Sequence, residues 1–282
     1  MSDTQDKNNE LPLDGIKEYK REIKEFSGRN VVFFYLEGKE HVLEKEHKIR
    51  RFVKKGYFVN GYKESKYYFS NPESWNDPCE KKFLAENLNK GLKLPCIRAL
   101  CSSNSTVDSE EALWFVDRGQ KDEPMVCTYI NLHSFLEELC RNLPENVGVF
   151  VSQINYRRNL KNLSAEKVRE YLSSLKTENV TEEYIKILSL KRTAFAYEDE
   201  IRIFLVCAEA FESDVKDSFA VKNMNYNNFV KEVLLPPFSP EEVEIIKKCI
   251  LNKRCKEERE ELENLLGESF KADIKKSRLY EP

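Results

Sequence analysis

The residues best suited to chemistry lie in residues 190–206, which read LKRTAFAYEDEIRIFLV. If the second half of this segment is a strand, Glu198, Glu200 and Arg202 point to one face, because side chains alternate along a β-strand. Two neighbouring carboxylates can differ in pKa, so that one stays ionised and stabilises a cationic transition state, with the arginine keeping it charged. A solvated edge strand with a cross-strand ion pair explains the same pattern. Both interpretations stay open.

A second segment, residues 66–80 (KYYFSNPESWNDPCE), combines an aromatic strand with a loop rich in Asn and Asp. Tyr68 and Ser70 share one face of the expected strand. Asn76 and Asp77 lie in the loop, where such side chains hydrogen-bond to nearby backbone. A loop of this kind can form the rim of a pocket, although a core strand followed by an ordinary turn has the same composition.

Two further pairs of residues are candidates. Trp114 and Arg118 have the spacing of one helical face, and an aromatic ring beside a cation suits a nucleotide base and its phosphate. Ordinary packing of the tryptophan is the alternative. Cys101 and His133 have the chemistry of a nucleophile and a base, but no catalytic signature surrounds either residue, so a buried thiol and a helix-face histidine are favoured.

Composition and charge exclude several classes of protein. The chain has 282 residues, of which 40% are hydrophobic and 11% aromatic, unlike a disordered protein. The 46 basic and 49 acidic residues rule out a broadly basic surface for nucleic acid. A local basic stretch at residues 39–66, which includes Arg50 and Arg51, can meet a phosphate backbone or form a solvated helix face.

Metal binding and membrane insertion are not expected either. The eight cysteines include no C-x-x-C pair and only three histidines are present, so we expect reduced thiols and no metal site. No apolar run is long enough to span a membrane, and the first residues, MSDTQDKNNELPLDG, lack the apolar core of a signal peptide. We therefore expect a cytoplasmic protein with no membrane partner.

The hydrophobic pattern predicts the elements that position these residues. Strands are expected at residues 31–36, 66–70, 96–101, 125–130, 147–151, 200–207 and 231–235. Helices are expected over residues 12–29, 42–56, 130–143, 164–175 and 240–252, with a continuation over 255–266. A short helix is expected to begin at the Asp77-Pro78 step.

These elements indicate an α+β fold. Six to eight strands interspersed with helices, and no internal repeat, favour one domain over residues 12–282 with mixed or antiparallel sheets. Residues 1–11 are expected to be disordered, residues 12–29 to form an N-terminal helical arm, and residues 161–181 to form a helical insertion.

Four blocks of the sequence, YYFSNPESWNDPCE, LWFV, LKRTAFAYEDEIRIF and KSRLY, resemble the family catalogued as domain of unknown function 2971. In that pattern an aromatic strand ends in F-S-x-P, and F-N-D-P-x-E, a Trp-containing segment and K-x-x-x-F-x-Y-E-x-E-x-R follow. The match spans most of residues 31–280. It departs from the pattern at Trp75, where the family usually has Phe.

The order of elements is also similar to the ADP-ribosyltransferase fold, in which NAD lies in a cleft between two small sheets. This resemblance implies a split sheet and makes Glu200 the catalytic glutamate, with Glu198 as general base beside the incoming nucleophile. Breaking the nicotinamide–ribose bond builds positive charge on the sugar, which a preorganised carboxylate stabilises.

The same resemblance assigns the binding of NAD. It places Tyr35, Tyr68 and Ser70 around the nicotinamide half, with Tyr35 near the position of the usual Arg or His of the first strand. It gives Arg202 the role of orienting a glutamate. The full set of candidate NAD-binding residues is Tyr35, Tyr68, Ser70, Asn76, Asp77, Trp114 and Arg202.

The resulting hypothesis is an NAD-dependent ADP-ribosyltransferase that modifies a protein or nucleic-acid acceptor, as a bacterial toxin or phage-defence effector with a neutralising partner or chaperone. It predicts a cleft lined by Tyr68, Ser70 and Glu200, and expects Glu200→Gln to leave the fold intact. One alternative is a non-enzymatic module that docks a partner protein on a flat patch. Another is a nuclease in which Asp77, Glu198 and Glu200 hold a divalent metal.

Overall fold

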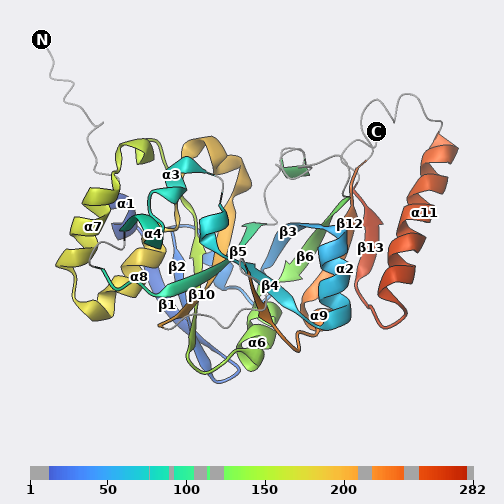
Figure 1. The fold of residues 1–282 in the computed structure, drawn as a ribbon. Helices are drawn as coiled ribbons and strands as arrows, with labels where there is room; N and C mark the ends of the chain where they lie inside the picture. The colour runs from blue at the N-terminus through green and yellow to red at the C-terminus, as the bar shows by residue number, and fades with distance from the viewer. Residues whose placement is uncertain are drawn as a thin grey trace, which may run out of the picture.

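The computed structural model describes residues 13–75, 77–88, 92–104, 113–114, 124–208, 218–237 and 248–277, and these contain one large mixed sheet (Figure 1). Its strands are β1 (Lys20–Phe26), β2 (Arg29–Tyr35), β3 (Lys48–Lys54), β4 (Tyr67–Ser70), β5 (Cys96–Asn104), β6 (Met125–Asn131), β7 (Val147–Gln153), β10 (Glu200–Cys207), β11 (Ser218–Val221), β12 (Val230–Leu235) and β13 (Asp273–Lys276). The strand order is β1-β2-β7-β10-β5-β3-β6-β12-β13, and β4 joins β5 and β11 outside this path. The mixed sheet confirms the expected α+β class.

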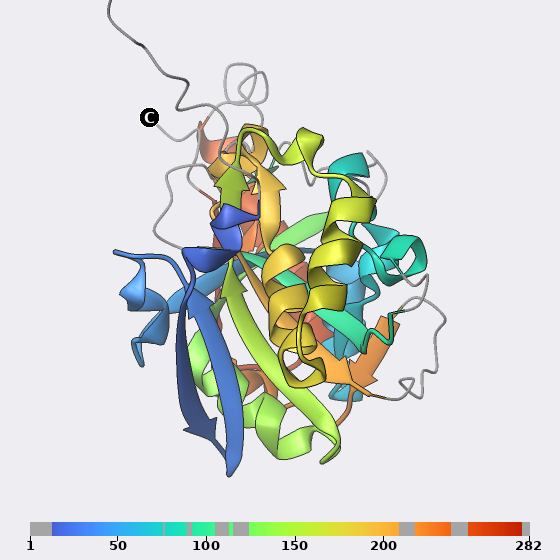
Figure 2. The ribbon, with the colours of Figure 1, turned by 90° about the vertical axis from the view of Figure 1, so that its left-hand side faces the viewer.

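Helices cover both halves of this sheet. They are α1 (Asp14–Lys17), α2 (Lys55–Glu64), α3 (Pro78–Lys81), α4 (Ala85–Leu88), α6 (Leu132–Asn142), α7 (Ala165–Ser174), α8 (Thr177–Ile187), α9 (Tyr226–Phe229) and α11 (Lys248–Leu266). Figure 2 shows α7 and α8 beside the half that contains β1, β2 and β7, whereas α2 and α11 lie at the other end in Figure 1. No helix of the described ranges is long and apolar enough to cross a bilayer.

The sheet is narrowest where its two halves meet. There β3 pairs with β5 through only Ile49 with Asn104 and Arg50 with Ser103. By contrast, β10 pairs with β5 along its whole length, from Glu200 to Cys207. The short β3–β5 junction lets the two halves diverge, and it places the first residues of β10 beside the point of divergence.

Strand β10 is central and separates two hydrophobic cores. Ile201, Ile203 and Leu205 pack into the core shared with α6, and Phe204 and Val206 pack into the core under α7 and α8. This alternation is the one expected from the sequence. All eight residues of β10 are buried, and both of its edges are paired, with β5 and β7. The alternative of a solvated edge strand is therefore wrong.

The expected N-terminal helical arm at residues 12–29 is wrong. Only α1 is helical, and the apolar residues that follow belong to β1, which pairs antiparallel with β2. The two strands are joined by Ser27 and Gly28, whose φ angles of 49° and 79° are those of a two-residue hairpin turn. The Ser-Gly pair was the available signal for a hairpin, and it outweighs the helical spacing of Ile16, Tyr19 and Ile23.

The expected helix at residues 42–56 is also wrong. A single turn, η1 (Glu40–Leu43), precedes strand β3, whose pairing with β6 uses every residue from Lys48 to Lys54. The helix in this region is α2, which begins at Lys55 and runs through Gly56. Apolar residues on both faces of a central strand can imitate helical spacing, because both faces are covered.

The other expected elements divide into those that the structure describes and those that it leaves out. Strands β4, β5, β6, β7, β10 and β12 and helices α3, α6 and α7 confirm the expected positions. Residues 161–181 are largely helical, and Leu172 packs into the second core. The predictions for residues 1–11 and for the start of the 240–252 helix lie outside the described residues, and α11 confirms the helix over 255–266.

The packing of α6 gives a first prediction. Phe135 is fully buried, and its ring centroid lies 4.9 Å from the ring centroid of Tyr67 and 5.1 Å from that of Phe229. We expect Phe135→Ala to lower the free energy of unfolding by about 3–5 kcal/mol, because it removes apolar contacts and leaves a cavity. Urea denaturation measures this loss. Ile23→Ala, at a side chain that is 45% exposed, is the control and should cost less than about 1 kcal/mol; equal losses would contradict the packing.

Candidate active site

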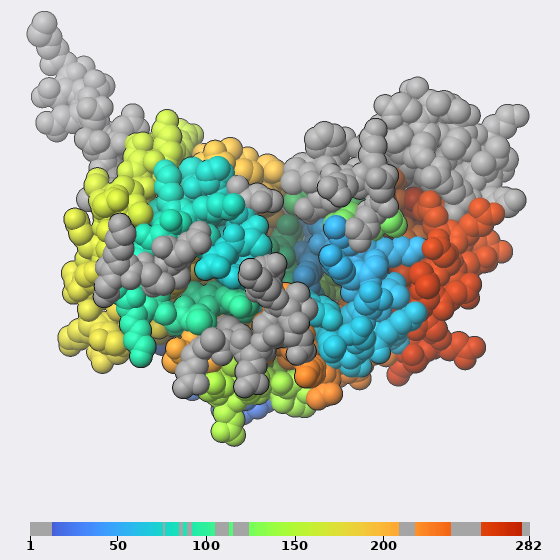
Figure 3. Space-filling model, viewed as in Figure 1, coloured from blue at the N-terminus to red at the C-terminus, as the bar shows by residue number. Residues whose placement is uncertain are grey.

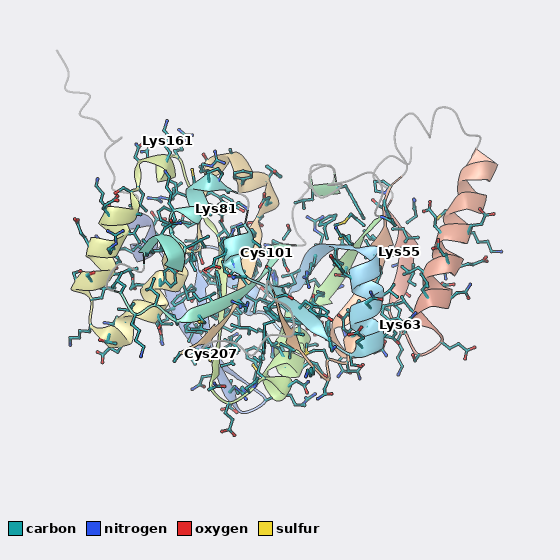
Figure 4. The ribbon with its side chains drawn as sticks, in the orientation of Figure 1. Lys55, Lys63, Lys81, Cys101, Lys161 and Cys207 are labelled. Atoms are coloured by element: carbon teal, nitrogen blue, oxygen red, sulfur yellow. The ribbon has the colours of Figure 1, made fainter. Side chains whose placement is uncertain are left out.

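A cavity of about 600 Å³ opens where the two halves of the sheet meet. In the space-filling view the surface is hollowed between the teal segment that includes α3 and the blue segment that includes α2 (Figure 3). Figure 4 places Cys101, which lines the cavity, in the middle of the molecule between Lys81 on α3 and Lys55 on α2. The volume is within the range of small-molecule sites in proteins.

A buried ion pair between Arg202 and Glu200 forms one wall of this cavity. Nε of Arg202 donates to Oε1 of Glu200 at 2.7 Å, and Nη2 donates to Oε2 at 3.0 Å. The two residues are only 1% and 5% exposed. Such a two-pronged contact fixes the orientation of the carboxylate as well as its charge.

Three other groups surround the guanidinium of Arg202. Its Nη2 also donates to Glu80 of α3 at 2.5 Å, and its Nη1 donates to the carbonyl oxygen of Leu188 at 2.6 Å. The indole ring of Trp75 covers its face, with 4.0 Å between Cζ and the ring centroid. These contacts offset the cost of burying the charge.

Lys191 links Glu200 to the second carboxylate. This lysine lies on β9 (Leu190–Arg192), which pairs with β8 (Asn155–Arg157). Its Nζ donates to Glu200 at 2.9 Å and to Glu198 at 2.6 Å. The two glutamates are therefore held on either side of one ammonium group.

A turn, and not strand alternation, brings Glu198 to the site. Glu198 ends the short helix η4 (Thr193–Glu198), and β10 begins at Glu200. Between them Asp199 has a left-handed backbone, with a φ of 37°. The prediction that Glu198 and Glu200 share one strand face is wrong, although the turn places both side chains in the cavity.

The environment separates the acidities of these two carboxyl groups. Burial raises the pKa of Glu198 to about 7, and the negative charge of Glu200 adds to this effect while Lys191 opposes it. Burial also disfavours the ionised form of Glu200, but Arg202 and Lys191 outweigh it and lower its pKa to about 2. At neutral pH Glu200 is a fixed anion, and Glu198 can accept or release a proton.

The thiol of Cys101 lies beside Glu200 in the same cavity. Cys101 is exposed to the open cavity, but desolvation by the surrounding protein and the charge of Glu200 raise the pKa of its thiol well above its usual value. His133, on α6, packs instead against the ring of Phe26 on β1, with 4.9 Å between ring centroids. Cys101 is therefore not an activated nucleophile, and the structure does not pair it with His133.

Several of the predicted NAD-binding residues lie outside the cavity. Tyr35 is part of the hydrophobic core, and Tyr68 lines a different cavity. The hydroxyl of Ser70 donates to the carbonyl oxygen of Ala99 at 3.1 Å. The expected cleft with Tyr68, Ser70 and Glu200 as its lining is therefore wrong. The core position of Tyr35 follows from its place in β2, an interior strand whose two faces contribute to the two hydrophobic cores.

The remaining predicted residues are split between the site and its surroundings. Asp77 lines the cavity, caps α3 by accepting from the backbone N–H of Cys79 at 2.9 Å, and pairs with Arg192 at 3.0 Å. Trp114 is buried and packs edge-on against Phe52, as the packing interpretation predicts. Asn76 and Arg118 lie outside the described residues.

Several residues of the site, among them four with charged or aromatic side chains near Arg202 or on β3, were not among the predicted site residues. Arg50, Trp75, Glu80 and Lys191 all line the cavity. Arg50 is 2% exposed on β3, where its Nη2 donates to the carbonyl oxygen of Asn104 at 3.3 Å. The sequence carried a signal for Arg50 in the basic stretch at 39–66, and for Lys191 in its place before the two glutamates.

The geometry of the acidic residues bears on two alternatives drawn from the sequence, a metal-dependent nuclease and a module that docks a partner on a flat patch. The described residues contain no group of three His, Cys, Asp or Glu side chains placed to hold a metal ion. Asp77, Glu198 and Glu200 each pair with a cation of the protein instead. The acidic residues also lie in a cavity and not on a flat patch. The arrangement is typical of a site for a small ligand.

Comparison with models of known protein families, with curated proteins and with solved structures finds no match for this chain. The resemblances to domain of unknown function 2971 and to the ADP-ribosyltransferases therefore stay predictions from the sequence.

The ion pair gives a second prediction, which revises the expectation for Glu200→Gln. We expect this substitution to lower the free energy of unfolding by about 3–5 kcal/mol, because it leaves the buried Arg202 undercompensated. The control is Glu182→Gln, which removes an exposed partner of Arg21 at 2.8 Å and should cost at most about 1 kcal/mol. Urea denaturation of both variants measures the difference. Unchanged stability of Glu200→Gln would show that the pair does not hold the site together.

Proposed function

We propose that this chain is an ADP-ribosyltransferase-like enzyme that uses NAD to modify a protein or nucleic-acid acceptor. The observation that carries the proposal is the pair of glutamates in one cavity, one held as an anion and the other with a pKa of about 7. Transfer from NAD needs both properties, because positive charge develops on the ribose while the acceptor loses a proton.

Each glutamate has a distinct role in the proposed step. The bond between nicotinamide and the anomeric carbon breaks, and its electron pair leaves with the nicotinamide. Glu200, fixed by Arg202 and Lys191, stabilises the positive charge on the sugar. The acceptor forms the new bond to the anomeric carbon, and Glu198 takes its proton.

The cations of the cavity suit the remaining part of the substrate. Arg50 on β3 and Arg192 on β9 both line the cavity and can face the pyrophosphate of NAD. In the ADP-ribosyltransferases the first strand carries an Arg or His, and in this chain Tyr35 lies near that position but is buried in the core. In the proposed site Arg50 supplies the positive charge instead. The narrow β3–β5 junction, at which two halves of the sheet diverge, also supports a cleft of the ADP-ribosyltransferase kind.

A role as a toxin or phage-defence effector belongs to the same proposal. Consumption of NAD or modification of an essential macromolecule harms a cell, so the chain would act with a neutralising partner or chaperone. This role is tested by comparing the growth of cells that express the wild type with the growth of cells that express Glu198→Gln, because the variant lacks the proposed general base.

NAD turnover by the purified protein gives the third prediction. Nicotinamide release, with a cell lysate as the source of acceptor, should fall about 10²–10⁴-fold in Glu198→Gln, because the general base is lost. Below pH 7 the wild-type rate should rise with pH, since only the deprotonated carboxylate accepts a proton and the pKa of Glu198 is about 7.

The control for this experiment is Glu183→Gln. Glu183 is 18% exposed and pairs with Lys186 at 2.7 Å, much as Glu198 is 17% exposed and pairs with Lys191 at 2.6 Å. Its removal should leave turnover unchanged. The proposal fails if the wild type releases no nicotinamide and shows no thermal shift with NAD, or if Glu198→Gln is as active as the wild type.

A further inference from the structure

A second cavity, of about 550 Å³, lies on the opposite side of β3 from the first. Side chains alternate along this strand, so Arg50 and Phe52 face the first cavity while Arg51 and Val53 face the second. The second cavity is enclosed between α2 and the half of the sheet that contains β3, β6 and β12. It is therefore separate from the carboxylates of the candidate active site.

Aromatic rings form much of its lining. Tyr67 and Tyr226 are buried with 5.6 Å between their ring centroids, and Phe58 of α2 lies 5.8 Å from Tyr226. Tyr68 and the exposed Tyr57 continue this wall toward the opening. Together these rings give the cavity an apolar aromatic wall against which the base of a ligand can pack.

The guanidinium of Arg51 lies against the aromatic wall. The Cζ atom of Arg51 is 4.9 Å from the ring centroid of Tyr67, and its Nη2 donates to the carbonyl oxygen of Tyr68 at 3.4 Å. Within the described ranges no carboxylate forms an ion pair with Arg51. Glu64, which also lines the cavity, pairs with Lys66 at 2.9 Å. The guanidinium is thus held in place and keeps donors for an anionic ligand.

Polar groups complete the site. The amide of Asn60 and the hydroxyl of Ser218 line the cavity together with the buried Thr128. These groups suit the edge of a base and the hydroxyls of a sugar. An apolar aromatic wall, a few hydrogen-bonding groups and a cation are the features that bind a base, a sugar and a phosphate.

We propose that this second cavity binds a nucleoside monophosphate, with its base against the aromatic wall and its phosphate on Arg51. The ligand is distinct from the NAD of the proposed reaction, because β3 separates it from Glu198 and Glu200.

Titration with AMP, adenosine and inorganic phosphate, followed by calorimetry and by ligand-observed NMR, tests this site. AMP should bind the wild type saturably and more tightly than adenosine, and Arg51→Gln should weaken AMP binding about tenfold or more while leaving adenosine binding nearly unchanged. Arg21→Gln is the control, because it removes an exposed arginine that lies on β1 and does not line the cavity. This variant should bind AMP as the wild type does.

Two further variants serve as controls for this test. Asn60→Trp places a large side chain at an exposed position of the lining, and should weaken both AMP and adenosine without removing Arg51. Glu198→Gln should bind AMP normally, because Glu198 lies in the first cavity. Circular dichroism establishes that each variant is folded. The proposal is overturned if AMP does not bind saturably, if Arg51→Gln binds it as tightly as the wild type, or if Glu198→Gln abolishes binding.

Discussion

The site depends on the buried contact between Arg202 and Glu200. Burying either charge alone costs several kcal/mol, so the pair is stable only where further hydrogen bonds and charges surround it. Here those partners come from separate parts of the chain: Glu80 on α3, Lys191 on β9 and the carbonyl oxygen before β9. The requirement to satisfy one buried guanidinium thus draws α3, β9 and β10 to a single point.

This requirement also produces the difference between the two glutamates. Arg202 pairs with Glu200, whereas Lys191 is shared between the two glutamates, so Glu198 gains less from these cations than it loses by burial. A carboxyl group with a pKa of about 7 next to a permanent anion can transfer a proton while the anion stabilises positive charge, and neither residue can do both alone. The cavity at the β3–β5 junction then gives a ligand access to both.

The central strand and its polar end were predictable from the sequence, because alternating polar and apolar side chains followed by a continuous apolar run leave little choice for β10. The role of Asp77 at the start of α3 was also predictable, since Asp before Pro caps a helix. The roles of Arg50 and Glu80 were not, because only strand pairing and the placement of α3 bring them to the cavity that Glu200 lines. Tyr35 and Tyr68 were misplaced for the same reason: their positions depend on which face of the sheet each strand presents.

The two N-terminal errors have a common physical cause. Apolar residues at 16–26 and 42–53 have helical spacing, but in each segment a neighbouring strand offers backbone hydrogen bonds along its length. Tertiary pairing outweighs local periodicity in both segments. That residues 48–54 form strand β3 and not a helix matters for function, because the side chains of a strand alternate between its two faces. This alternation places Arg50 in one cavity and Arg51 in the other.

The most direct test of this account is a carboxyl-carbon NMR titration of the protein labelled with ¹³C-glutamate, with Glu198→Gln used to assign the signal of Glu198. The account predicts one carboxyl group with a midpoint near pH 7, absent from the variant, and a Glu200 signal that stays ionised to about pH 3. Two glutamates that both titrate near 4.5 would contradict the separation of charge on which the proposed chemistry depends.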